Sequence, residues 1–184
     1  MSKFEVYEPA EDSFLMSETL EEVIPILLAK NFNLKFLEIG AGSAVQLQTA
    51  LRAGIKKENI LGVDINNEAV KKCKKLGFKC INSNLFSRVK GKFDIIVFNP
   101  PYLPEDTREP KESSVATTGG KKGGEIVNKF LKQAKKHLAR EGKIILLIST
   151  LTKGINFLDY EVKSLAERKL FFEKLQILEL SFSG

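Results

Sequence analysis

The amino-acid sequence predicts an α/β protein whose seven strands form one mostly parallel sheet, with helices on both faces and an antiparallel C-terminal hairpin strand. Three observations lead to this prediction. Short apolar runs rich in β-branched residues alternate with stretches of helical periodicity. A glycine turn follows the first run, and an acidic residue ends the second. Near the C-terminus two strand-like runs follow each other directly. Such a doubly wound sheet is Rossmann-like.

The elements follow one another without a repeat, a low-complexity tract or a linker, so we expect one domain over residues 1–184. Asp12 or Ser13 should cap the first helix, and Pro25 should kink it or split it in two. Gly142 should stop the last helix. The strands are predicted at residues 34–39, 59–64, 78–81, 93–98, 143–149, 160–166 and 174–180, and the later helices at residues 45–53, 67–76 and 125–140.

The composition is that of a globular protein, with 43% hydrophobic and 28% charged residues. The net charge of +6 permits a nucleic-acid partner, but we favour a solvated lysine-rich surface as its explanation. No apolar run reaches the length of a membrane span, and the first residues lack a signal-peptide pattern. Cys73 and Cys80 have no metal-binding spacing, and His137, expected at the surface, is the only histidine. We therefore expect free thiols, no metal site and a cytoplasmic location.

The glycine turn after the first strand has the layout of a mononucleotide-binding site. Gly40 and Gly42 let the backbone approach a ligand, and Asp64 ends the second strand, where an acid can accept hydrogen bonds from ribose hydroxyls. Val45 stands in place of the third glycine of a dinucleotide motif, and Glu38 would repel a pyrophosphate. A cofactor with a ribose but no phosphate fits better. S-adenosylmethionine is the candidate, and Glu38 would orient the glycine loop or receive the cofactor's ammonium group.

The fourth strand, residues 93–98, ends abruptly at Asn99-Pro100-Pro101-Tyr102. The prolines cannot donate to a ladder, so the polar end of this strand is held stiffly at the carboxyl edge of the sheet, where such folds bind ligands. A planar NH₂ acceptor has two donors and needs two fixed acceptors. The Asn99 side-chain oxygen and the Pro100 carbonyl can supply them, and Tyr102 can pack on the flat group. The same residues would also serve as a plain turn.

Together these residues resemble the class I S-adenosylmethionine-dependent methyltransferases. More narrowly, they resemble the HemK-like glutamine methyltransferases of translation release factors, in their short archaeal and eukaryotic form. The resemblance spans nearly the whole chain, although the NPPY motif alone is shared with adenine-N6 methyltransferases. The segments that carry it are Tyr7–Ser13, Leu37–Ser43, Val63–Asp64, Asn99–Tyr102, Gly119–Glu125 and Lys169–Leu175.

The resemblance implies the site and its partners. Residues 1–30 would cover the cofactor; Asn99, Pro100 and Tyr102 would be catalytic, and together with Pro101 they would bind the substrate. That substrate would be the Gly-Gly-Gln loop of a release factor, clamped by residues 103–122, and a small zinc-binding activator subunit would be a partner. The implied cofactor-binding residues are Tyr7, Pro9, Glu11, Asp12, Ser13, Glu38, Gly40, Gly42, Asp64, Ile65, Asn84, Leu85 and Asn99.

Three departures from the family pattern accompany the resemblance. Ala44 replaces a usual glycine, and Asn84 replaces an acid that would accept from the adenine amino group. Residues 150–159 are too short for the usual helix before the last hairpin.

Two alternatives to glutamine methylation stay open. One is methylation of adenine N6 in a nucleic acid, which shares the NPPY chemistry. The other is a methyltransferase-like module without activity.

Overall fold

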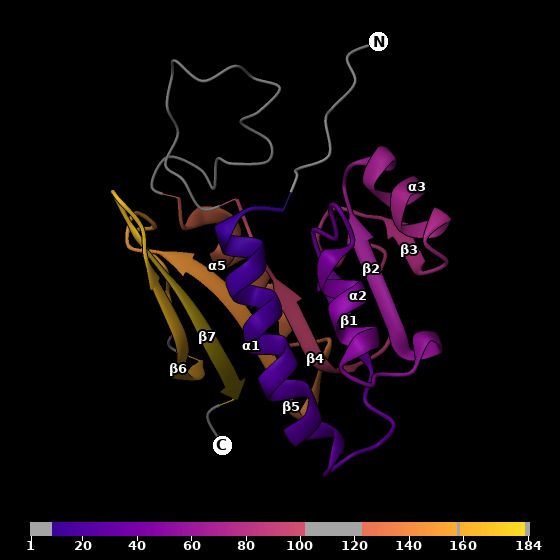
Figure 1. The fold of residues 1–184 in the computed structure, drawn as a ribbon. Coiled ribbons are helices and arrows are strands. Elements are labelled where there is room, and N and C mark those ends of the chain that lie inside the picture. Colours follow the sequence, from indigo (N-terminus) through magenta and orange to yellow (C-terminus); the bar gives the residue numbers. More distant parts are fainter. Residues whose placement is uncertain (1–8, 102–122, 158, 183–184) are drawn as a thin grey trace.

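The computed structural model describes residues 9–101, 123–157 and 159–182, and it contains the predicted seven-stranded sheet (Figure 1). The strand order is β3-β2-β1-β4-β5-β7-β6. The first five strands in the chain pair in parallel, whereas β7 pairs antiparallel with both β5 and β6. The strands are β1 (Phe36–Ile39), β2 (Ile60–Asp64), β3 (Lys79–Asn82), β4 (Phe93–Phe98), β5 (Leu138–Ser149), β6 (Tyr160–Lys169) and β7 (Lys174–Phe182). The predicted fold class is confirmed.

Helices cover both faces of the sheet, because alternate strand residues point into two separate apolar cores. One core packs α1, α2 and α3 against one face, and the other packs α5 and residues 85–89 against the opposite face. Neighbouring residues Ile95 and Ile96 of β4 illustrate this alternation, because each belongs to a different core. The helices are α1 (Glu11–Leu28), α2 (Val45–Arg52), α3 (Asn67–Lys75) and α5 (Glu125–Ala134), with a short 3₁₀ turn, η1 (Lys57–Asn59).

The parallel arrangement brings the carboxyl ends of β1, β2 and β4 to one edge of the sheet. The first turn of α1 and the turn between β6 and β7 lie at this same edge (Figure 1). Asn66 caps α3, since its side chain accepts from the Glu68 backbone N–H at 2.9 Å. The C-terminal hairpin is confirmed as well, and β6 continues to Lys169, beyond its predicted end.

Two predictions about the last helix and fifth strand were wrong. Helix α5 ends at Ala134 rather than Arg140, and β5 begins at Leu138 rather than Lys143. The ladder to β4 causes this difference, because the Phe93 backbone N–H donates to the His137 carbonyl at 2.8 Å. Gly142 therefore lies inside β5. A Cβ atom there would come within 2.8 Å of the Leu138 side chain, so packing in the strand, not a helix stop, requires this glycine.

The first helix also differs from its prediction. Neither Asp12 nor Ser13 caps it, because the helix begins at Glu11 and Ala10 occupies the N-cap position. Pro25 lies inside the helix without splitting it. This proline removes only the hydrogen bond to the Glu21 carbonyl, and Glu21 is exposed to water, which can replace the lost donor.

Residues 150–157 contain no helix, as their length suggested. Within the described ranges, no helix combines the length and the apolar character that crossing a bilayer would require.

Candidate active site

The glycine turn between β1 and α2 is shaped by left-handed backbone conformations. Gly40 has a φ of 73° and Gly42 a φ of 47°, values that side chains disfavour. The backbone N–H groups of Gly40 and Ala41 both donate to the Val63 carbonyl, at 2.8 and 2.9 Å. Ala44 also has a left-handed φ, 69°, which explains physically why a glycine would suit that position. The turn thus lies directly over the end of β2.

Asp64, at the end of β2, holds the glycine turn through its carboxylate. Its Oδ2 atom accepts from the Gly42 backbone N–H at 2.8 Å, and its Oδ1 atom accepts from the Asn66 backbone N–H at 2.7 Å. Burial raises the pKa of Asp64, and these two donors together with the Ile65 N–H oppose that rise. Each carboxylate oxygen keeps a second lone pair, so Asp64 can still accept from a ribose hydroxyl.

Glu38, in β1 directly before the turn, is a buried acid. Its side chain is 3% exposed, and none of the described residues donates to its Oε2 atom. Burial is the main cause that raises the pKa of Glu38 well above its ordinary value, and nearby Cys73 and Asp64 raise it further. A buried acceptor without a donor is costly, so this atom suits a ligand that brings its own donor, such as an ammonium group.

Asn99, at the end of β4, is oriented by an acid from a distant part of the chain. Its Nδ2 atom donates to Asp12 Oδ2 of α1 at 3.2 Å. Its Oδ1 atom is buried and receives no hydrogen bond from the described part of the chain. A Cβ atom on Gly40 would lie 4.0 Å from the Asn99 carbonyl oxygen, so the polar end of β4 adjoins the glycine turn. The Asn99 amide therefore presents its oxygen, not its nitrogen, as the group available to a ligand.

The first turn of α1 is fixed on both sides of Asp12. The Ser13 carbonyl accepts from Gln46 Nε2 of α2 at 2.9 Å, and Ser17 donates to Gln46 Oε1 at 2.9 Å. Asp12 Oδ1 accepts from the Ser13 backbone N–H at 2.6 Å. Asp12, Ser13 and Gln46 are all buried. The acid that orients Asn99 is thus supported by a polar network with helix α2.

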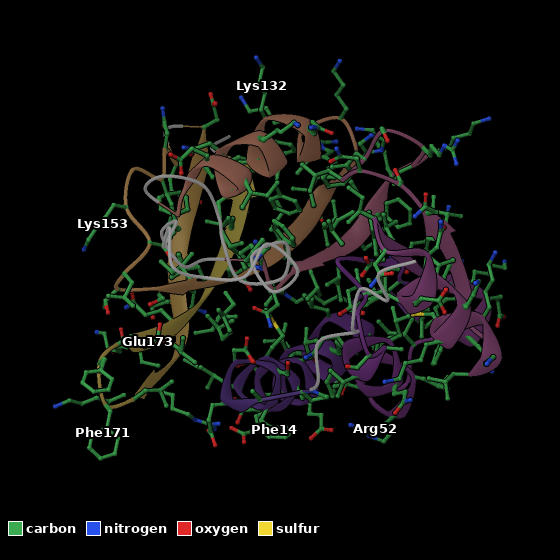
Figure 2. All side chains as sticks on the ribbon, turned by 90° about the horizontal axis from the view of Figure 1, so that it is seen from above. Phe14, Arg52, Lys132, Lys153, Phe171 and Glu173 are labelled. Atoms are coloured by element: carbon green, nitrogen blue, oxygen red, sulfur yellow. The ribbon has the colours of Figure 1, made fainter. Side chains whose placement is uncertain are left out.

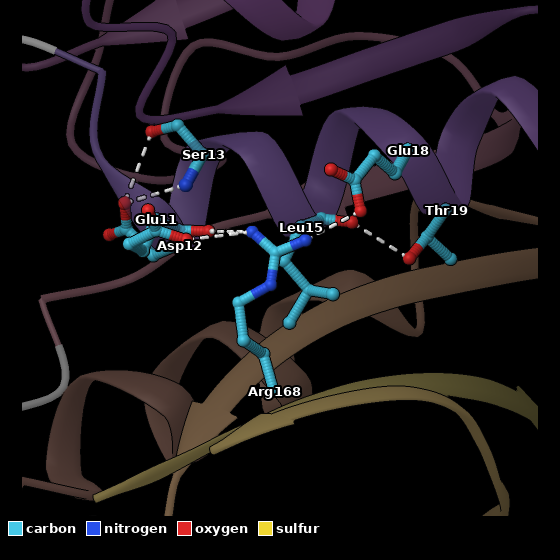
Figure 3. Close-up of polar contacts among 7 residues, drawn as sticks. All are labelled: Glu11, Asp12, Ser13, Leu15, Glu18, Thr19 and Arg168. Carbon is cyan, nitrogen blue, oxygen red and sulfur yellow. Dashed lines mark hydrogen bonds and ion pairs between the residues drawn. The ribbon is translucent and has the colours of Figure 1, made fainter. Parts of the chain in front are cut away.

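A second set of contacts joins this turn to the hairpin. Arg168 of β6 reaches across to α1, where it pairs with Glu11 at 2.9 Å and with Glu18 at 2.6 Å (Figure 3). Its Nη1 atom also lies 3.4 Å from the Glu11 carbonyl oxygen. The Glu11 carboxylate, implied above as a cofactor ligand, is thus engaged with the hairpin. Its role towards the cofactor stays a prediction.

The part of the site that is predicted to bind the adenine of the cofactor lies beyond the end of β3. Asn84 is exposed, Ile65 is 58% exposed, and Leu85 is buried with a left-handed φ of 49°. Sequence reasoning missed two residues that shape this region. Asn82 Nδ2 donates to the Ile65 carbonyl at 2.7 Å, and the Ser83 backbone N–H donates to the Asp64 carbonyl at 2.9 Å. The only sequence pattern that pointed to Asn82 and Ser83 was a pair of small polar residues at a strand end.

The structure therefore gathers most of the predicted residues at one edge. Asp12, Gly40, Gly42, Asp64 and Asn99 are connected there by hydrogen bonds or close packing. Pro9 and Pro101 are partly buried and Pro100 is buried. Tyr7, Tyr102 and the predicted clamp at residues 103–122 lie outside the described residues.

This edge offers several hydrogen-bond acceptors. Glu38, Asp64 and Asn99 supply oxygen atoms, and the glycine turn leaves room for a close ligand. These groups fit a cofactor with ribose hydroxyls, an ammonium group and no phosphate. No cluster of three or more His, Cys, Asp or Glu side chains suited to a metal ion occurs within residues 9–101, 123–157 and 159–182.

Comparisons with known proteins agree with this chemistry. The family model described as "Methyltransferase small domain" matches residues 22–170. A Methanocaldococcus jannaschii protein named as an N5-glutamine methyltransferase is 38% identical, over 95% of this chain and 90% of that protein. The eRF1 methyltransferase catalytic subunit mtq2 of Schizosaccharomyces pombe is 29% identical, over 96% and 89% respectively. A chain from the E. cuniculi Mtq2–Trm112 complex, which methylates the eRF1 termination factor, superposes with a TM-score of 0.72 at 24% identity, covering 96% of this chain and 98% of that one.

Proposed function

The chain belongs to the methyltransferase small domain family, within the HemK-like glutamine methyltransferases, and we propose from this that it methylates a glutamine side chain in a protein. The methyl donor is S-adenosylmethionine, and the acceptor is the glutamine of the Gly-Gly-Gln loop in a peptide-chain release factor. The relatives named for N5-glutamine and eRF1 methylation support this acceptor. In this proposal residues 1–184 work as one domain, and residues 1–30 cover the cofactor.

One observation carries the proposal: the buried Oδ1 atom of Asn99 has no donor among the described residues. A primary amide has two N–H donors and needs an acceptor for each. Asn99 Oδ1 accepts one hydrogen, and the Pro100 carbonyl accepts the other, because the following Pro101 has no N–H and keeps that carbonyl outside a ladder. Asp12 accepts from the Asn99 nitrogen at 3.2 Å, which opposes a rotation of the amide that would place its NH₂ group where its oxygen lies.

These two acceptors would direct the lone pair of the glutamine nitrogen. The lone pair of an amide is delocalised, so the nitrogen is a poor nucleophile until its hydrogens are held out of the amide plane. When bound, S-adenosylmethionine supplies a methyl group already activated on a sulfonium. The nitrogen would form one N–C bond while the bond between the methyl group and the sulfur breaks, the sulfur keeping the electron pair as a neutral thioether, and the nitrogen would afterwards lose one proton to water. Alignment accounts for the catalysis, and a histidine base is not required.

The cofactor would be held by residues on three neighbouring strands. Asp64 would accept from the ribose hydroxyls, and Glu38 would receive the ammonium group directly or through water. Gly40 and Gly42 would let the cofactor approach the backbone. Asn84 would accept from the adenine amino group through its side-chain oxygen, without a charge. Tyr102 would pack on the acceptor amide.

The partners are part of the same proposal. A small activator subunit that binds zinc would form a heterodimer with this chain. The structure of the Mtq2–Trm112 complex, in which the relative has a partner, supports an activator. The reaction would take place in the cytoplasm, where release factors work.

The direct test is the mass of a release factor after incubation with the enzyme, the activator and S-adenosylmethionine. We expect a gain of one methyl group, lost when the glutamine of the Gly-Gly-Gln loop is changed to alanine. Asn99→Ala should lower kcat about 10²- to 10³-fold, the usual cost of one preorganised hydrogen-bonding group in an active site. Cofactor binding, to which Asn99 is also implied to contribute, should weaken much less than kcat, which calorimetry would measure.

Asn59→Ala provides the matched control, because Asn59 lies at the opposite edge of the sheet, beside the start of β2. Its activity should equal that of the wild type. Methylation of adenine in DNA or RNA, together with an unmodified release factor, would contradict the proposal and support the nucleic-acid alternative.

A further inference from the structure

The turn between β6 and β7 carries two phenylalanines that are almost fully exposed. Phe171 is 99% exposed and Phe172 is 92% exposed, and their ring centroids lie 6.2 Å apart. Figure 2 shows Phe171 at the rim of the molecule, pointing away from the ribbon. Two adjacent aromatic side chains bury no apolar surface in this position, so the fold itself gains nothing from them. An exposed apolar pair of this kind indicates a contact with another molecule.

The pair stands on a firmly built hairpin. The β6–β7 ladder continues to the Lys169–Lys174 pair, and the Leu170 backbone N–H donates to the Glu173 carbonyl at 2.8 Å. Ser149 donates to the Glu173 carboxylate, and the Lys174 backbone N–H donates to Thr150 Oγ1 at 3.0 Å. These bonds hold the tip of the hairpin, residues 170–173, against the end of β5. A rigid tip presents its aromatic side chains at a low entropic cost of binding.

The tip also lies at the reactive edge of the sheet. Strand β6 is three places from β4 in the sheet, which is about 14 Å at the usual strand spacing. Along the strands, Leu147 of β5 pairs with Ile177, so Phe172 lies roughly five residues, or about 17 Å, beyond the level of Asn99. The separation is therefore roughly 20 Å. A protein interface of standard size, about 800 Å² on each side, spans such a distance.

We propose that Phe171 and Phe172 form a docking contact for the acceptor protein, inserting into an apolar recess on its surface while its glutamine lies at Asn99. This inference rests on the proposed function, because only a macromolecular acceptor can reach both points. The position of the tip favours the acceptor protein over other binding partners, because the tip lies at the same edge of the sheet as the site where the acceptor must bind. Contacts remote from the reacting amide supply binding energy that a short substrate lacks. Aromatic side chains often dominate such contacts.

The test compares a whole release factor with a short peptide that contains the Gly-Gly-Gln sequence. With Phe171→Ala and Phe172→Ala combined, kcat/KM for the whole factor should fall about 10- to 100-fold, mainly through KM, as expected for two aromatic anchors. For the peptide kcat/KM should stay unchanged, because the peptide does not reach the tip. Full exposure of both side chains means that the variant should fold normally, which its unfolding temperature will verify.

Phe32→Ala is the matched control. Phe32 is 77% exposed, but it precedes β1 and so lies at the opposite edge of the sheet. This variant should treat both substrates as the wild type does. Changing both tip residues to leucine instead should recover part of the activity on the whole factor, because an apolar side chain can still fill the recess.

Four results would overturn the inference: an equal loss with the peptide, an unchanged kcat/KM for the whole factor, weaker binding of the activator subunit, or a dimer of this chain that dissociates in the variant. The last two would assign the tip to another occupant. If the wild type methylates neither substrate, the proposed function fails. Binding of the release factor to immobilised wild-type and variant protein would then still decide whether the tip is a docking contact.

Discussion

At the scale of single residues, the site depends on carboxylates and amides whose partners come from distant segments. Asp64 connects β2 to the glycine turn, and Asp12 connects α1 to Asn99. Both carboxylates already accept hydrogen bonds from groups of the protein. Glu38 differs from them, since one of its oxygens is buried without a described donor. We infer that Glu38 lowers the stability of the free enzyme for the benefit of ligand binding.

This inference predicts a specific dependence of stability on pH. The pKa of Glu38 is raised in the folded state, so between the ordinary value of 4.5 and the raised value the folded protein holds a proton that the unfolded chain has lost. The free energy of unfolding must therefore fall as pH rises through this window. In Glu38→Gln, the contribution of Glu38 to this decrease in the free energy of unfolding should disappear. The variant should also bind S-adenosylmethionine more weakly.

Thermal unfolding of both proteins at several pH values, with and without cofactor, would measure this. Asp64 also has a raised pKa and contributes a fall of the same sign, so the difference between the two proteins reports Glu38 together with its electrostatic interaction with Asp64. Parallel curves for the wild type and the variant would refute the prediction.

At the scale of elements, the hairpin and the first helix stabilise each other through Arg168. The side chains of Glu11 and Glu18 are 57% and 61% exposed, so these ion pairs contribute little to global stability. Their effect is local, because Glu11 precedes Asp12, which orients Asn99.

Arg168→Gln should therefore change activity more than stability. We expect an unfolding temperature lower by at most about 2–4 °C, corresponding to about 1 kcal/mol, and a kcat reduced several-fold. High salt, about 1 M, should lower kcat of the wild type towards that of the variant, because it screens exposed charges. Arg52→Gln, which removes a comparable 3.0 Å pair with Glu21 farther along α1, should leave kcat unchanged. An equal loss of kcat in both variants would show that the contact at the first turn has no special role.

The elements also show what the sequence can and cannot predict. Strands β1, β2 and β4 were predicted well, because they are mostly apolar and a glycine, an acid or an Asn-Pro pair marks their ends. The end of α5 was missed, since residues 135–140 continue the helical periodicity and only pairing with β4 overrides it. The Asp12–Asn99 bond was not predicted either. It joins residues 87 positions apart, and no local pattern encodes such a contact.

At the scale of the whole molecule, the cofactor should stabilise the fold, because its ligands come from α1 and from several strands of the sheet. S-adenosylmethionine at about 100 times its Kd should add about 2.7 kcal/mol, which raises the unfolding temperature by roughly 5–10 °C. Asn84→Asp restores the charged acceptor of the family pattern and should increase affinity about fivefold. Titrations that follow the unfolding temperature would measure both effects.

Asn59→Asp adds the same charge at the opposite edge of the sheet and serves as the control. An equal gain in affinity with Asn59→Asp would mean that general attraction of the cationic cofactor, and not a bond to its adenine, explains the effect.

The position of β7 between β5 and β6 has a consequence for how the protein is made. Among the described strands β6 pairs only with β7, so its ten residues cannot join the sheet while residues 174–182 are still inside the ribosome. The Arg168 contacts with α1 must wait as well. During synthesis the cofactor half of the sheet can fold first, whereas the hairpin and its contacts with the first turn of α1 form only after β7 has emerged.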